Sequence, residues 1–335
     1  MRRGHLCQAP LSVSSKSISG PPEKARIAPS FCIGMREIEQ LHAGGTFFEG
    51  LRWHDGFWWA SDFYADGGKV IGLDPEGNLV REISLEQPSG LGWLPDGDLL
   101  AVSMTQHKIF RVGTDGEPRE YADLSEFSRG EANDMTVDSE GRAWVGSFGY
   151  DLYAGEQAKG AVLMRVDPDG TVSAAAEDLH FPNSVLIPAD GKTLLVAETI
   201  AARVAAFDLA ADGTLSNRRV YVQIAPSPAL EEIDAEYTKV GFGPDGCTLD
   251  AEGCLWCGDS LGRRVARIAP GGEILEEIPS PKEGYMTVAA ALGGPDGRTL
   301  LMAVAPDWRL GMGSGEPLAS LWTARVDVPH SSGRP

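Results

Sequence analysis

Six turns that end in glycine recur along the chain, and an acidic or amide side chain stands at a fixed distance before four of them. Each turn joins two short apolar strands. The turn glycines are Gly56, Gly97, Gly141, Gly191, Gly253 and Gly297. Eight residues before each glycine, or seven before the first, stand Glu49, Ser89, Asn133, Asn183, Asp245 and Ala289. The series therefore holds two carboxylates and two carboxamides at equivalent positions.

If the equivalent positions of a repeat surround one axis, these four side chains converge on one point. Two carboxylates held close together repel each other, and one of them takes up a proton unless a cation lies between them. Carboxylate and amide oxygens are ligands of hard divalent cations, so the set favours Ca²⁺, Mg²⁺ or Mn²⁺ over soft metals. The alternative is that each side chain caps backbone groups at the start of a strand, as Asn and Asp often do.

The strands that position these residues are indicated by a second set of turns between the first. Asp-Gly and Pro-Asp-Gly sequences, as at 167–170 and 212–213, supply the positive φ of tight hairpins. Each unit then holds two hairpins, and the glycines of the first set are 41, 44, 50, 62 and 44 residues apart. This period predicts an all-β fold, a six-bladed β-propeller with four antiparallel strands per blade. We expect residues 36–41 to supply the outer strand of the last blade, beside a strand at 320–326, because an open ring would expose sheet edges.

Two long segments are expected to shape the pocket. The candidate ligands begin the innermost strands, so the glycine turns lie on the other face of the ring. Residues 149–160 and 225–243 share the face of the ligands, and the second contains a helix-like stretch at 229–239. His180 stands just before Asn183 and lies on this face too, which makes it a candidate for substrate binding.

Composition excludes several classes of partner. The 335 residues carry a formal net charge of −19, and such a surface repels nucleic acid and anionic lipid, so neither is an expected partner. No apolar run is long enough to span a membrane. Five cysteines, an odd number, suit a reducing compartment, which favours the cytoplasm. Cys254 and Cys257 form a C-x-x-C pair within a strand, and we interpret them as structural thiols.

The first 34 residues differ from the rest of the chain. They hold five basic residues and one acidic residue, together with many Ser and Pro, a composition typical of disorder. We therefore expect a disordered N-terminal extension over residues 1–34 and the propeller over residues 35–330. An organelle-targeting segment is the alternative for the extension.

Four motifs around the candidate ligands carry a family resemblance. From about His42 to Asp307 the chain resembles the senescence-marker-protein/gluconolactonase/luciferin-regenerating-enzyme-like family of calcium-dependent six-bladed propeller lactonases, and it also resembles diisopropylfluorophosphatase. The motifs are Phe48–Gly56, Asn133–Asp138, Phe181–Ser184 and Pro244–Asp250. The chain departs from the family pattern at Glu131, where some members have Arg, and at Ser184, where Gly is commoner.

The resemblance implies a metal-dependent hydrolase that opens a lactone ring. It implies that Glu49, Asn183 and Asp245 bind one divalent cation, Ca²⁺ before Mg²⁺, Mn²⁺ or Zn²⁺. The cation polarises the lactone carbonyl, Asp245 acts as the general base, and Asn133 contacts the substrate or the metal-bound water. We predict Glu131 and His180, together with Asn133, as substrate-binding residues. A phosphotriesterase could use the same site, and a non-catalytic propeller braced by the cation is the third alternative.

Overall fold

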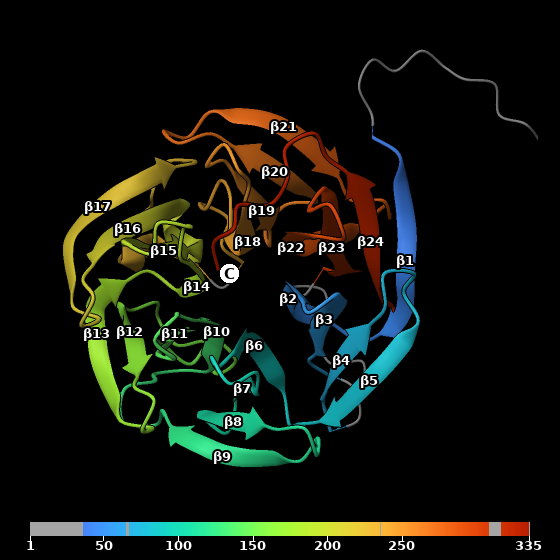
Figure 1. Cartoon of the computed structure of the whole chain (residues 1–335). Helices are drawn as coiled ribbons and strands as arrows, with labels where there is room; N and C mark the ends of the chain where they lie inside the picture. The colour runs from blue at the N-terminus through green and yellow to red at the C-terminus, as the bar shows by residue number, and fades with distance from the viewer. Residues whose placement is uncertain (1–35, 65–66, 235, 308–315, 335) are drawn as a thin grey trace, which may run out of the picture. The chain divides into compact units, whose positions relative to one another are not determined.

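The computed structural model describes residues 36–64, 67–234, 236–307 and 316–334. Within this part of the chain the structure is all-β, in a propeller-like arrangement around a central axis (Figure 1). The helical segments described there are two short 3₁₀ turns, Thr199–Ala201 and Leu230–Glu232. None of the described helical segments has the length and apolar character that a membrane crossing needs. The predicted extension over residues 1–34 lies outside the described residues.

Four sheets have four antiparallel strands each, in chain order from the axis outwards. The first holds β2 (Phe48–His54), β3 (Phe57–Asp62), β4 (Lys69–Leu73) and β5 (Leu79–Ser84). The second holds β6 (Pro88–Trp93), β7 (Leu99–Ser103), β8 (Lys108–Val112) and β9 (Pro118–Asp123). The third holds β10 (Ala132–Val137), β11 (Ala143–Ser147), β12 (Ala161–Val166) and β13 (Val172–Leu179). The fourth holds β14 (Pro182–Leu186), β15 (Thr193–Glu198), β16 (Arg203–Leu209) and β17 (Leu215–Gln223).

The fifth sheet has eight strands, so the prediction of six separate four-stranded sheets is wrong. One half contains β18 (Pro244–Leu249), β19 (Leu255–Asp259), β20 (Arg264–Ile268) and β21 (Ile274–Pro279). The other half contains β1 (Ile38–Gly45), β24 (Ala319–Arg325), β23 (Thr299–Pro306) and β22 (Tyr285–Gly293). The halves meet where Gly246 of β18 pairs with Ala289 of β22. A Cβ on Gly246 would lie 2.4 Å from the Cβ of Ala289, so the missing side chain is what allows this close approach.

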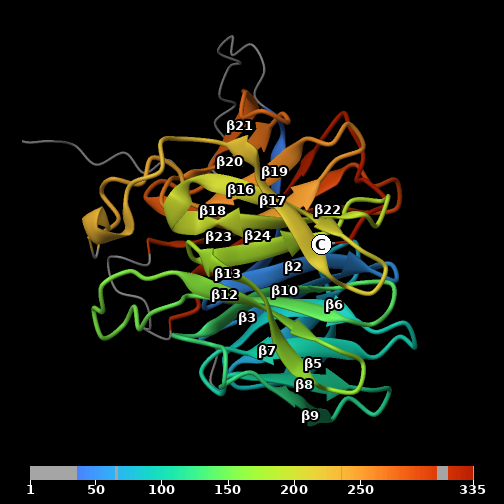
Figure 2. The same ribbon diagram turned by 90° about the vertical axis from the view of Figure 1, so that its left-hand side faces the viewer.

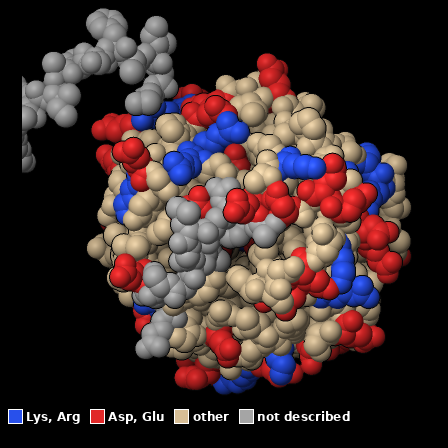
Figure 3. All heavy atoms as spheres, turned by 180° about the vertical axis from the view of Figure 1, so that it is seen from behind, with Lys and Arg blue, Asp and Glu red and all other residues tan. Residues whose placement is uncertain are grey.

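The two ends of the described chain close the ring, as the sequence predicts. Strand β1 pairs antiparallel with β24, from Ile38 opposite Ala324 to Gly45 opposite Ala319. The expected helix at 229–239 is wrong, because the described residues there form only the 3₁₀ turn Leu230–Glu232. In the side view, segments 149–160 and 225–234 project from one face of the ring (Figure 2). On that face, acidic and basic side chains are interspersed (Figure 3).

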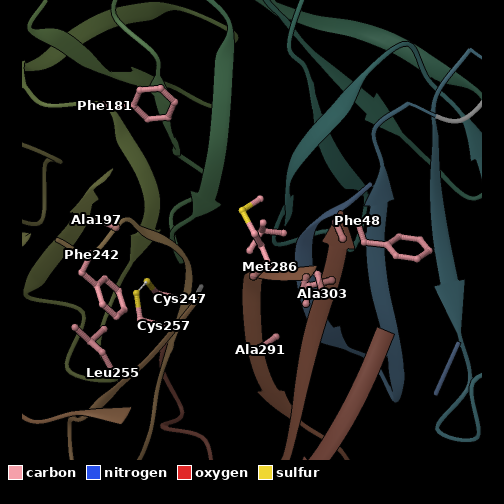
Figure 4. Close-up of a cluster of buried hydrophobic side chains, with 14 of the residues drawn as sticks. Phe48, Phe181, Ala197, Phe242, Cys247, Leu255, Cys257, Met286, Ala291 and Ala303 are labelled. Carbon is pink, nitrogen blue, oxygen red and sulfur yellow. Dashed lines mark hydrogen bonds between the residues drawn. The ribbon is translucent and has the colours of Figure 1, made fainter. Parts of the chain in front are cut away.

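The core fills the space between neighbouring sheets. One buried cluster runs from Phe181 and Phe242 to Phe48 (Figure 4). Cys247 and Cys257 face each other across β18 and β19 with their Sγ atoms 2.7 Å apart. The three cysteines among the described residues, Cys247, Cys254 and Cys257, are buried and free.

The C-terminal segment 329–334 crosses the face of the glycine turns. Ile187, just after β14, exchanges backbone hydrogen bonds of 2.8 and 2.7 Å with Arg334. Arg334 also donates a hydrogen bond from its guanidinium to the carbonyl of Val137, at the end of β10. Ser331 donates to the carbonyl of Leu249, at the end of β18. The segment therefore ties together the carboxyl ends of three inner strands.

Candidate active site

Five of the six residues predicted at equivalent positions occupy the second position of an inner strand and line one cavity. They are Glu49 in β2, Ser89 in β6, Asn133 in β10, Asn183 in β14 and Asp245 in β18. The sixth, Ala289, lies further along β22 and does not line the cavity. The structure thus brings together the two carboxylates and two carboxamides that the sequence analysis singled out.

A β-bulge at the start of each of these strands re-aims its first side chains. In β6, β10, β14 and β18 the pairing register with the next strand of the sheet shifts within three residues of the strand start. In β2 the shift follows Glu49. Bulges bend a strand and are common beside active sites. In β2 the bulge includes Gly50 at φ +58°, where a Cβ would lie 2.3 Å from the carbonyl oxygen of Ser89. Only glycine fits between the two inner strands at that point.

The cavity measures about 680 Å³ when the open space at its mouth is included. Its floor is polar and includes Thr199 and Ser260 as well as the five residues above. Its wall is apolar above that floor. The aromatic residues of the wall are Phe47, Phe63, Phe148, Tyr153, Phe181 and Tyr237.

The two floor carboxylates are held in an environment that disfavours their charge. Burial raises the pKa of Asp245 to about 7, and hydrogen bonds with Ser260 and Asn183 offset part of that increase. Burial also raises the pKa of Glu49 well above its usual value, and the charges of Asp245 and Asp134 raise it further. Two groups of like charge in a buried site shift each other in this direction.

A hydrogen-bonded network that the sequence analysis missed lies beneath the floor. Arg52 of β2 donates from Nη2 to Asp134 Oδ1 at 2.6 Å and to the carbonyl of Met135 at 2.7 Å. Asp134 Oδ2 accepts from the hydroxyl of Ser184 at 2.8 Å, and that hydroxyl accepts from the backbone N–H of Cys247 at 2.9 Å. The network thus links β2, β10, β14 and β18.

Two sequence signals could have identified this network. Arg52 and Asp134 are charged residues inside the inner strands β2 and β10, and both are 4% exposed. Charged residues at such positions need a partner. Ser184, noted only as a departure from glycine, supplies the hydroxyl that carries the network from Asp134 to β18.

The charge balance at the floor fits a divalent cation. Glu49, Asp134 and Asp245 are three neighbouring carboxylates, and Arg52 is the cation paired with one of them. With all three carboxylates ionised, the group carries two uncompensated negative charges. The atoms that could bind a metal here are oxygens, which hard cations prefer. Within the described residues no cluster of three or more His, Cys, Asp or Glu side chains could hold a metal. The predicted ligand set contains only two residues of those types, and Asn183 is its third member.

Comparison with known proteins places these features in a family. Residues 47–306 match the model of the SMP-30/gluconolactonase/LRE-like region. The chain belongs to this family.

Three relatives show how far the similarity extends. A 6-deoxy-6-sulfogluconolactonase of Pseudomonas putida is 28% identical over 279 residues, which cover 80% of this chain and 87% of that protein. A pentonolactonase of Haloferax volcanii is 28% identical over 298 residues, covering 86% and 92%. The crystal structure of regucalcin, a calcium-binding protein of Agrobacterium tumefaciens, superposes with a TM-score of 0.67 at 21% identity, covering 87% and 95%. This last likeness shows the propeller-like fold.

Two predicted substrate-binding residues of this gluconolactonase-like chain do not line the cavity. Glu131 is half-buried, and burial raises its pKa. The backbone N–H of His180 donates to the buried carboxylate of Glu198, and burial lowers the pKa of its ring. The structure therefore separates both side chains from the other four predicted site residues.

Proposed function

We propose that this protein is a metal-dependent lactonase that opens a cyclic ester by adding water. The observation that carries the proposal is the convergence of two carboxylates and two carboxamides from four inner strands on the floor of one cavity. The names of the two lactonase relatives support the same reaction class. We also interpret the eight-stranded sheet as two blades joined at their inner strands, which makes the ring a six-bladed propeller.

The cation site is assigned to three floor residues. Glu49, Asn183 and Asp245 hold one divalent cation, for which Ca²⁺ is the first candidate and Mg²⁺, Mn²⁺ and Zn²⁺ are alternatives. The regucalcin described as calcium-binding supports the choice of Ca²⁺. When bound, the cation supplies Lewis-acid polarisation of the ester carbonyl.

The protein's own residues supply the proton transfers and the orientation. Asp245 accepts a proton from the water that attacks the carbonyl carbon, and that proton reaches the ring oxygen as its bond to the carbonyl carbon breaks. Asn133 orients the substrate from β10. Its Nδ2 lies 3.5 Å from the carbonyl oxygen of Pro182. The apolar wall excludes bulk water from the floor, which strengthens the electrostatic interactions there.

Substitution of the carboxylates tests this assignment. We expect Asp245→Asn to remain folded and to lose at least about two orders of magnitude in kcat, the usual effect of removing a positioned general base. Glu49→Gln should lose cation affinity, so that excess cation restores part of its activity. Asp55→Asn makes the same chemical change in a glycine turn on the opposite face and should retain full activity. If Asp245→Asn retains full activity, the role given to this residue is wrong.

The alternatives are separated by substrates assayed in one cation-loaded preparation. A lactone panel is compared with a phosphotriester, and elemental analysis measures the cation in the same sample. Faster turnover of the phosphotriester would favour the phosphotriesterase alternative. Bound cation without turnover of either class would favour a non-catalytic propeller.

A further inference from the structure

The wall of the cavity is built from two groups of packed aromatic rings. Phe148 and Phe181 stack with their centroids 4.3 Å apart and their planes at 21°. Phe47 packs edge-on against Phe63 with centroids 6.4 Å apart. All four rings line the cavity, and aliphatic side chains complete the wall between them. A ligand on the floor is therefore surrounded by apolar surface.

The tyrosine hydroxyls of the wall and the threonine hydroxyl of the floor are engaged with other protein groups. The Tyr237 hydroxyl lies 2.6 Å from that of Tyr150, and the Tyr153 hydroxyl lies 3.3 Å from that of Tyr64. On the floor, Thr199 donates from its hydroxyl to the carbonyl of Pro244. Among the described residues, the cavity lining includes no Arg, Lys, His or Gln side chain. A ligand with many hydroxyl groups would leave most of them without partners on this wall.

The backbone is strained at Phe181, whose ring lines the cavity. Its φ is +60°, and for a bulky residue such a left-handed conformation is an outlier. Strain of this kind persists only where the surrounding structure imposes it, and it is frequent at ligand-binding positions. Phe181 precedes Pro182 and the floor residue Asn183 by one and two positions, so the same turn positions the wall and the floor.

From these observations we propose that the cavity takes an apolar lactone, with an alkyl or aryl group on the ring, and rejects polyhydroxylated sugar lactones. The proposal rests on the proposed lactonase function and specifies its substrate class. The ester group reaches the polar floor, while the apolar substituent packs against the aromatic rings.

Paired six-membered lactones test this specificity. The cation-loaded full chain is assayed with an alkyl δ-lactone and with glucono-1,5-lactone, and each kcat/KM is divided by the rate constant of spontaneous hydrolysis. We expect a preference of at least about 100-fold for the alkyl lactone, the scale on which an apolar pocket rejects even one added hydroxyl. Equal turnover, or a preference for the sugar lactone, would overturn the proposed specificity and leave the lactonase function intact.

One variant and one control locate this preference in the wall. Asn tolerates left-handed backbone better than Phe, so Phe181→Asn should fold while it introduces a polar group. We expect this variant to raise KM for the alkyl lactone about tenfold or more and to reduce the preference. Phe57→Asn makes the same change in β3, at the opposite end of the strand pair, and should leave the preference unchanged. An unchanged preference in Phe181→Asn would also contradict the proposal.

Binding of unreactive lactams separates specificity from catalysis. Calorimetry with alkyl and polyhydroxylated δ-lactams should give at least about tenfold tighter binding of the alkyl lactam, with the negative heat-capacity change of apolar burial. If neither lactone is hydrolysed while the alkyl lactam still binds more tightly, the proposed function fails and the apolar preference stands. Equal binding of the two lactams overturns the apolar preference whatever the turnover.

Discussion

The two ends of the inner strands differ in almost every respect. At the amino ends the ladders are bulged, two carboxylates lie close together, and the strands open into a cavity. At the carboxyl ends tight glycine turns close each hairpin, and segment 329–334 adds further backbone hydrogen bonds. The regular ends stabilise the ring, whereas the irregular ends hold charged groups in unfavourable positions. Such division is expected where a site is maintained at the expense of local stability.

The largest effect on stability should come from breaking the network beneath the floor. Arg52→Met leaves Asp134 buried without its ion-pair partner, and losses of this kind amount to about 3–5 kcal/mol. Denaturant unfolding measures the change. Arg119→Met removes the exposed pair with Asp115 and should change the free energy of unfolding far less, because exposed ion pairs contribute little to stability. Similar effects of the two substitutions would show that the buried network does not stabilise the amino ends.

Removal of the C-terminal segment should weaken the opposite ends of the strands. A chain that stops at residue 328 loses the backbone hydrogen bonds between Ile187 and Arg334 and those made by residues 329–331. With a net contribution of about 1 kcal/mol for each hydrogen bond, offset by the entropy gained by the freed residues, we expect a loss of about 1–3 kcal/mol. Thermal unfolding should show this loss while kcat/KM changes less than about twofold. A large loss of activity without loss of stability would mean that the two ends are coupled.

The metal-free protein should become less stable as pH rises, because of the two carboxylates at the amino ends of the inner strands. Glu49 and Asp245 have raised pKa values in the folded protein, so between about pH 4 and 7 the folded state binds more protons than the unfolded state. This stabilisation is present below the pKa of the group in the unfolded state and is lost as pH rises through its pKa in the folded state. Its size is about 1.4 kcal/mol for each pKa unit by which the two states differ.

Comparison of the wild type with Glu49→Gln separates the contribution of Glu49 from that of other titrating groups. In chelator, the melting temperature of the wild type minus that of Glu49→Gln should fall between pH 5 and 8. Saturating Ca²⁺ should abolish most of this slope, because the cation replaces the protons. Parallel curves for the two proteins in chelator would contradict the pKa assignment of Glu49.

The smallest effect should come from removing residues 1–34. The ring closes through β1 and β24 without residues 1–34. A chain that begins at Met35 should therefore show the same melting temperature and the same activity as the full chain. A lower melting temperature after this truncation would show that the extension contributes to the fold.

The sequence predicted what is local and periodic. Turn chemistry and strand spacing located the inner strands, and the offset from the glycines located Glu49, Asn133, Asn183 and Asp245 on them. The link between Arg52 and Asp134 spans 82 positions, and a periodic pattern carries no information about such a pairing. The joined sheet could not be predicted because it depends on how closely Gly246 approaches Ala289. His180 does not line the cavity, and Phe181, with a positive φ, lies between it and Asn183 in the chain.

The closure of the ring by β1 and β24 has a consequence for how the chain folds. Ile38 pairs with Ala324, so a contact between opposite ends of the described chain must form before the ring is complete. Contacts of such long range form slowly. During synthesis β1 emerges early and has no partner until β24 leaves the ribosome, and an unpaired strand edge promotes aggregation. The completed propeller has no such exposed seam, but each nascent chain passes through a long interval in which that seam is open.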